Sequence, residues 1–255
     1  MRKIVSIMFL LTTVLCFISC GLGHSKLRNF VEQLNKEMPK SYGTIGVTLS
    51  WRYEDGNVIV NYKINENFVD IDGIRENPEL FKESAKMLCN DMKNDYGAKK
   101  LLTLMDECDA GLVLHYIGNR TGKEVSVTLS SDEVKSVLKG NKEYSPLALL
   151  EQEIKVTNVH MPLNIEKGVV VKNLVLDGDM VVYNVIMDEN LYSIAALRSN
   201  EMALRDNIRS NIGINDPEMV RFIQICKKAN VAIAYKYIGD TSGDSFLVRF
   251  ECDEL

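Results

Sequence analysis

The sequence is poor in the residues that most catalytic and metal sites use. It has three histidines among 255 residues, and these are far apart, at positions 24, 115 and 160. Histidine is the commonest catalytic base and a common metal ligand, so three scattered copies argue against a triad or a metal centre. The HExxH, GxSxG, CxxC and phosphate-loop patterns are also missing. We therefore predict no catalytic residue, no metal ligand and no cofactor, and expect that the protein is not an enzyme.

An excess of positive charge is missing as well. The chain has 30 lysines and arginines against 35 aspartates and glutamates, a net charge of −5. Nucleic acids and anionic lipid surfaces are bound through clustered basic residues. We therefore expect no nucleic-acid partner and no membrane binding by charge.

The sequence also lacks an apolar run long enough to cross a bilayer comfortably. Its longest run, residues 4–18, has 15 residues and follows Arg2 and Lys3. A membrane-spanning helix needs about 20 apolar residues, whereas a basic start followed by a short apolar run is typical of an export signal. We predict that residues 1–19 are a signal peptide. Its removal leaves 28 basic and 35 acidic residues.

The end of the apolar run resembles the lipobox of bacterial lipoproteins. Residues 17–20 are Phe, Ile, Ser and Cys. The resemblance implies that Cys20 becomes the first residue of the mature chain and carries a lipid, with residues 20–25 as a tether. A multiply acylated terminus anchors a protein firmly to a membrane. The resemblance places the protein in the bacterial cell envelope, and because residues 21–24 contain no acid we expect it to face the periplasm.

The remaining cysteines do not define a disulfide framework. Cys16 lies in the signal, and the four cysteines beyond the lipobox allow three pairings. Cys89 and Cys108 fall on predicted antiparallel helices, about 9 Å apart along the axis, which is too far for a disulfide. We expect these two to be buried thiols. Whether Cys226 pairs with Cys252 stays open.

The chain consists of two copies of one unit. Landmarks recur at a nearly constant offset of 121 to 123 positions. Met38-Pro39 returns as Met161-Pro162, Asp55-Gly56 as Asp177-Gly178, and Tyr116-Ile117-Gly118 as Tyr237-Ile238-Gly239. A constant offset of this size indicates a tandem duplication of a whole domain rather than a solenoid. We predict a first repeat over residues 26–140 and a second over residues 145–255.

Hydrophobic periodicity predicts the same order of elements in both repeats. An amphipathic helix comes first, then a strand pair joined by Asp-Gly, two helices, and a closing strand pair. The predicted class is α+β, with each repeat a four-stranded antiparallel sheet that carries helices on one face. Trp51 and Tyr53 fall in the apolar stripe of their strand, so we expect them in the core. Residues 169–176 are apolar on both strand faces, which predicts that the second sheet is covered on both sides.

Two local patterns suggest binding sites but have simpler explanations. Asp70, Asp72 and Glu79 fall at ligand positions of a calcium loop, but Phe68 stands at its first position and cannot ligate. A polar loop before Asn77 is the favoured interpretation. The segments 118–122 and 239–243 resemble anion-binding glycine loops. They lie between two strands rather than before a helix, so hairpin turns are favoured.

The anchor, the duplicated scaffold and the missing catalytic motifs suggest three functions. The first is a lipid-anchored binding or protein-interaction module of the cell envelope, whose partner is an envelope protein or a glycan. The second is an envelope hydrolase or glycan-processing enzyme with carboxylates in the groove between the repeats. The third is an inhibitor of a secreted enzyme, because the tandem arrangement loosely resembles the shape of the secreted β-lactamase inhibitory proteins.

Overall fold

A computed structural model of the chain describes residues 23–93, 95–140, 143–211 and 217–254. The expected signal peptide and Cys20 lie outside these ranges, as does the side chain of Cys252. Within the described ranges, no helix is long and apolar enough to span a membrane.

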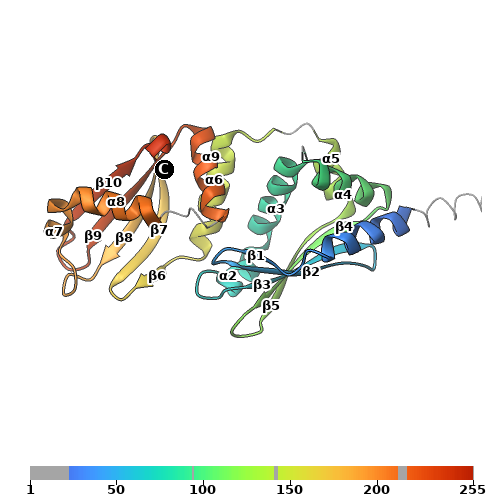
Figure 1. The fold of residues 1–255 in the computed structure, drawn as a ribbon, viewed down its shortest axis with the longest axis horizontal. Helices are drawn as coiled ribbons and strands as arrows, with labels where there is room; N and C mark the ends of the chain where they lie inside the picture. Colours follow the sequence, from blue (N-terminus) through green and yellow to red (C-terminus); the bar gives the residue numbers. More distant parts are fainter. Residues whose placement is uncertain (1–22, 94, 141–142, 212–216, 255) are drawn as a thin grey trace, which may run out of the picture.

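The first repeat folds around a five-stranded sheet with strand order β1-β2-β3-β4-β5. Figure 1 shows α3, α4 and α5 gathered on one side of this sheet. In chain order the elements are a helix over residues 23–35, β1 (Lys40–Tyr42), β2 (Gly46–Glu54), β3 (Asn57–Ile64), α2 (Ile71–Glu76), α3 (Pro78–Met92), α4 (Tyr96–Glu107), β4 (Gly111–Gly118), β5 (Glu124–Leu129) and α5 (Ser131–Lys139).

The second repeat has a sheet of the same kind, with strand order β10-β9-β8-β7-β6. Its elements are α6 (Pro146–Val159), β6 (Leu163–Glu166), β7 (Val169–Asp177), β8 (Met180–Met187), α7 (Ile194–Ser199), α8 (Glu201–Asn211), α9 (Pro217–Ala229), β9 (Ala232–Gly239), β10 (Ser245–Phe250) and a final 3-10 turn (Cys252–Glu254). The α+β class and the tandem repeat are therefore confirmed.

The predicted four-stranded antiparallel sheet was wrong in two details. Each sheet gains a short edge strand, β1 or β6, directly after a cis peptide bond, Met38–Pro39 or Met161–Pro162. The central pairs β3-β4 and β8-β9 are parallel. The reason is the helical crossover between the paired strands, which returns the chain to the end of the sheet where it started.

A bulge in β2 and another in β7 change which side chains of these strands face the core. The pairing register shifts between Thr48 and Ser50, so the facing of the strand reverses there. Thr48 is fully buried, whereas Leu49 is 39 % exposed. After the bulge Trp51 and Tyr53 pack against the first core, as predicted.

The same shift occurs in β7 between Val171 and Asn173. Val171 before the bulge and Leu174 after it are both buried. Val175, on the other face, is 38 % exposed. The double-faced apolar pattern therefore reflects the bulge rather than cover on both sides of the sheet.

Asparagines at matching positions fasten the first helix of each repeat to the strand beside its bulge. Asn35 Oδ1 accepts a hydrogen bond from the backbone amide of Trp51 at 2.7 Å. Asn158, at the matching position, accepts from the Leu174 amide and donates to the Leu174 carbonyl, both at 2.8 Å. The first helix of each repeat is therefore held at the same position along its sheet.

The predicted buried cysteines lie in the helical layer of the first repeat. Cys89, on α3, and Cys108, at the end of α4, are thiols. Burial raises the pKa of the Cys89 thiol to about 11. Cys108 is 6 % exposed and belongs to the first core. The Cys89 thiol therefore stays protonated at neutral pH, and Cys108 packs as a small apolar group.

Candidate interaction site

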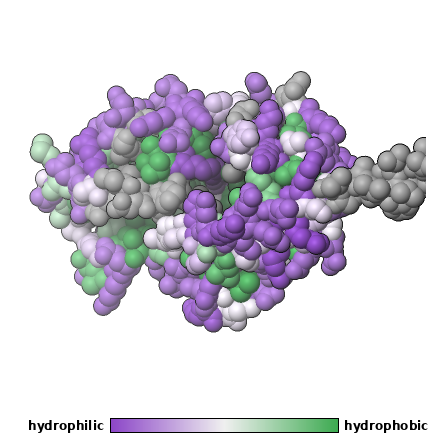
Figure 2. Space-filling view, turned by 45° about the vertical axis from the view of Figure 1, so that its right-hand side comes forward, coloured by the Kyte–Doolittle hydropathy of each residue, from purple (hydrophilic) through white to green (hydrophobic). Residues whose placement is uncertain are grey.

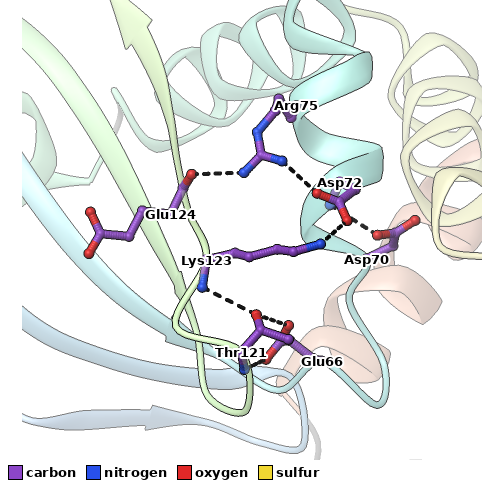
Figure 3. Close-up of polar contacts among 7 residues, drawn as sticks. All are labelled: Glu66, Asp70, Asp72, Arg75, Thr121, Lys123 and Glu124. Atoms are coloured by element: carbon purple, nitrogen blue, oxygen red, sulfur yellow. Dashed lines mark hydrogen bonds and ion pairs between the residues drawn. The ribbon is translucent and has the colours of Figure 1, made fainter.

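The glycine-rich turn of the first repeat is filled by the protein's own carboxylate. Glu66 Oε2 accepts hydrogen bonds from the backbone amides of Arg120 and Thr121, both at 2.7 Å. Its Oε1 accepts a hydrogen bond from the Thr121 hydroxyl at 2.6 Å (Figure 3). The Thr121 hydroxyl and these amides hold the pKa of the Glu66 carboxyl below its usual value. A Cβ on Gly118 would lie 2.6 Å from the carboxyl carbon of Glu66, which explains the glycine.

The second repeat uses the same arrangement. Glu189 Oε2 accepts from the backbone amides of Thr241 and Ser242 at 2.9 and 2.6 Å, and its Oε1 accepts from the Ser242 hydroxyl at 2.7 Å. An external anion would have to displace this carboxylate. In each repeat a glutamate that follows a strand thus holds the neighbouring hairpin turn in place. The segments 118–122 and 239–243 are hairpin turns, in agreement with the favoured interpretation.

The acidic segment before Asn77 is a helix rather than a loop. Asp70 caps α2 by accepting the backbone amide of Asp72 at 3.0 Å. The Asp72 carboxylate pairs with Lys123 and, at 2.5 Å, with Arg75 (Figure 3). The Lys123 ammonium holds the pKa of Asp72 below its usual value. Among the residues that the structure describes, no three acidic, histidine or cysteine side chains converge as metal ligands would.

The three histidines lie in three separate places. His24 Nδ1 is 2.5 Å from the Tyr53 hydroxyl, and His115 Nδ1 is 2.9 Å from the Ser126 hydroxyl. His160 follows α6 at the contact between the repeats. The fold does not bring these imidazoles together.

The contact between the repeats is made by the C-terminal half of α6 against α2 and α3. Gln152, which is 7 % exposed, donates a hydrogen bond from Nε2 to the Leu80 carbonyl at 2.9 Å. Val156 and Val159 pack against the apolar cluster of the first repeat around α2. A helix that belongs to the second repeat thus completes the core of the first.

His160, directly after α6, also contacts the first repeat. Its ring lies over Phe81, with 5.8 Å between ring centroids, and its Nδ1 accepts the backbone amide of Asp70 at 3.1 Å. Burial lowers the pKa of the His160 imidazole, although the charge of Asp70 opposes the shift. A neutral imidazole has one nitrogen that can accept a hydrogen bond, which is the role the geometry requires.

The corresponding surface of the second repeat is an open pocket of about 410 Å³. It lies on α7, on the start of α8 and on the segment before them. Its lining residues are Leu191, Tyr192, Ser193, Ala196, Leu197, Asn200, Ala203 and Leu204. Each of them stands 123 positions after a residue of the segment 68–81 in the first repeat, the segment that contains the residues contacting α6 and His160.

The difference between the two surfaces is the missing cover. Ile74 is 2 % and Phe81 9 % exposed beneath α6, whereas their counterparts Leu197 and Leu204 are only half-buried. Ile71 and Ile194, which face the sheets, are both 3 % exposed. The loss of burial is therefore confined to the side that α6 covers in the first repeat.

The pocket lies at one end of the molecule. In Figure 1, α7 is at the far left, opposite the end at which the helix over residues 23–35 begins. Figure 2 shows apolar side chains in separate patches among polar ones, including at the end distant from the N-terminal trace. Met202, next to the pocket, is 79 % exposed.

Sequence reasoning missed this pocket. Leu197 and Leu204 look like ordinary core positions of an amphipathic helix. The signal was the repeat itself, because Leu197 and Leu204 stand 123 positions after Ile74 and Phe81, which are buried in the first repeat.

Comparison with known proteins identifies no family. No family model matches the chain, and no curated protein matches it. One solved structure that it resembles is that of a protein of Pseudomonas aeruginosa predicted to be secreted, with 14 % identity, 45 % of this chain and 98 % of the other covered, and a TM-score of 0.37. A likeness this weak carries no functional information.

Proposed function

We propose that this protein is an interaction module of the bacterial cell envelope, anchored through a lipid on Cys20 and binding a partner protein through the pocket on α7 and α8. The observation that carries the proposal is the open pocket itself, whose counterpart in the first repeat is a packed contact with α6 of the same chain. The first repeat buries this surface under α6, whereas the second repeat leaves it open.

The lining favours binding over catalysis. None of its eight residues is an acid, a lysine, a histidine or a cysteine, so Tyr192 is the only side chain with an acidic proton. Burial raises the pKa of this phenol, which makes it a poorer acid. Aliphatic walls with a few polar groups suit a protein side chain better than a sugar, whose hydroxyls need many hydrogen-bond partners.

The start of the helix over residues 23–35 and α7, which carries the pocket, lie at opposite ends of the molecule's long axis (Figure 1). A lipid on Cys20 would hold the first repeat near the membrane and present the second repeat away from it. This polarity suits a module that recruits a partner from the periplasm.

Photo-crosslinking in cells tests the docking function. A benzoyl-phenylalanine at Met202, which is 79 % exposed beside the pocket, is compared with one at Tyr96, which is 83 % exposed on α4 of the first repeat. We expect one discrete crosslinked protein from position 202 and none from position 96. Equal or absent crosslinks at the two positions would contradict the proposal.

Lipidation is tested separately. Incorporation of labelled palmitate, with recovery in the membrane fraction, is expected for the natural chain and lost in Cys20→Ser. A Cys20→Ser chain that still carries palmitate would contradict the anchor without affecting the docking site.

A further inference from the structure

We infer that the pocket on α7 and α8 accepts the last turn of an amphipathic helix from the partner, as α2 and α3 accept the last turn of α6. This inference rests on the proposed docking function and names its ligand. In the first repeat the seated turn presents Val156 and Val159, one helical turn apart on one face. The second repeat repeats the receiving scaffold, with a capped short helix followed directly by a longer one.

The receiving features that remain are those a helix end needs. Leu197 and Leu204 offer an aliphatic floor, half-buried and open above. Asn200 stands where Asn77 separates α2 from α3, and its side chain donates to the Ala196 carbonyl at 2.8 Å, as Asn77 does to Gly73 at 2.9 Å. The backbone path that shapes the surface is thus the same in both repeats.

A second copy of this chain does not offer a matching helix. Its α6 is already seated between the two repeats. The equivalent helix of the first repeat has Gln33 and Lys36 at the positions of Val156 and Val159, and Glu37 at that of His160. A polar and charged turn cannot fill an aliphatic pocket without a desolvation cost. Neither of these two helices of a second copy fits the pocket, and we take a helix of another protein as the occupant.

One residue defines how the ligand must differ from α6. A Cβ on Gly73 would lie 2.6 Å from Cγ1 of Val159, so the first repeat admits valine only because residue 73 is glycine. The second repeat has Ala196 at this position. The partner helix should therefore carry a small residue, alanine, serine or glycine, where α6 carries Val159, with an aliphatic residue three positions earlier.

The test uses two synthetic peptides of residues 145–162, one with the natural sequence and one with Val159→Ala, and the mature full-length chain. Fluorescence anisotropy measures their affinities for the natural chain, for Ala196→Gly and for Ala196→Leu. Short isolated helices are marginal in water, so the ratios of affinities carry the result.

We expect the alanine peptide to bind the natural chain about tenfold more tightly than the valine peptide, a difference of about 1.4 kcal/mol. Ala196→Gly should restore binding of the valine peptide, and Ala196→Leu should abolish binding of both. A peptide with Val156→Asp, as control, should bind none of the chains. Because residue 196 is exposed on α7, melting curves are expected to show that all three chains fold.

Two results would overturn the inference. One is no binding of either peptide, or binding that ignores the size of residue 196. The other is a dimer in light scattering that Ala196→Leu dissociates, which would make a second copy the occupant. A discrete crosslink at position 202 would in either case keep the docking function while the helical ligand is rejected.

Discussion

At Thr48 the two repeats differ in whether a buried side chain carries a hydroxyl. Its side chain is fully buried beside the β2 bulge, and its hydroxyl has no hydrogen-bond partner among the described residues. The matching residue of the second repeat is Val171, which is 8 % exposed. We expect Thr48→Val to raise the free energy of unfolding by about 1 kcal/mol, because it removes an unpaired buried hydroxyl at nearly constant volume.

Urea unfolding of the full chain measures this change. The matched control is Val171→Thr, which places the hydroxyl at the same point of the second bulge and should lower the free energy of unfolding by a similar amount. A destabilised Thr48→Val chain would show that the hydroxyl has a partner, such as a buried water.

At the level of elements, ion pairs join the C-terminal segment of each repeat to one helix, α3 in the first repeat and α8 in the second. Each set consists of one glutamate and two cationic side chains. Glu133 on α5 pairs with Lys82 and Lys86 on α3, at 3.0 and 2.8 Å. In the second repeat Glu254 pairs with Arg209 and Arg205 on α8, at 2.5 and 3.9 Å. Partial burial would raise the pKa of Glu133, but the hydrogen bonds from Lys86, the Ser130 amide and Lys82 outweigh it and lower the pKa to about 2.

This pair predicts a defined acid sensitivity. A carboxyl whose pKa falls from 4.5 to about 2 on folding stabilises the folded state above pH 4.5 and loses that effect as the pH falls towards 2. Glu133→Gln should therefore cost about 1 kcal/mol at pH 7, after allowance for solvent screening. The difference between the two chains should vanish near pH 2. Thermal melts between pH 2 and 7 measure it, and a constant difference would contradict the pairing.

The elements also show which parts of the fold a sequence can predict. The repeated landmarks give the order of the main elements, because apolar period and turn residues are local properties. The extra residue at Leu49 is invisible to a period-two pattern, so the facing of half a strand was misread. The parallel pairing of β3 with β4 depends on a crossover path, which no local pattern encodes. In contrast, α5 had a readable signal, since Ser130 and Glu133 form a capping box.

For the whole molecule, the candidate site follows from the arrangement of the repeats and not from a motif. Its floor residues, Leu197 and Leu204, have the spacing of an ordinary apolar helix face. What makes them a surface is that they are only half-buried, whereas Ile74 and Phe81, their counterparts in the first repeat, belong to the cluster on which α6 packs. Motif reasoning looks for residues that do chemistry, and this pocket has none to find.

The contact between the repeats, at Gly73 and Val159, gives the last prediction. In isolation, Gly73→Ala should favour α2, because alanine stabilises a helix relative to glycine by about 1 kcal/mol. In this chain the new methyl group would meet Val159, so we expect a net loss of about 1 to 3 kcal/mol. Calorimetry should show the single transition of the natural chain splitting as the repeats separate. Adding Val159→Ala should restore much of the loss, because it removes the atom in conflict. A Gly73→Ala chain as stable as the natural one would mean that α6 can shift away at no cost, and that the first repeat does not need the second to complete its core.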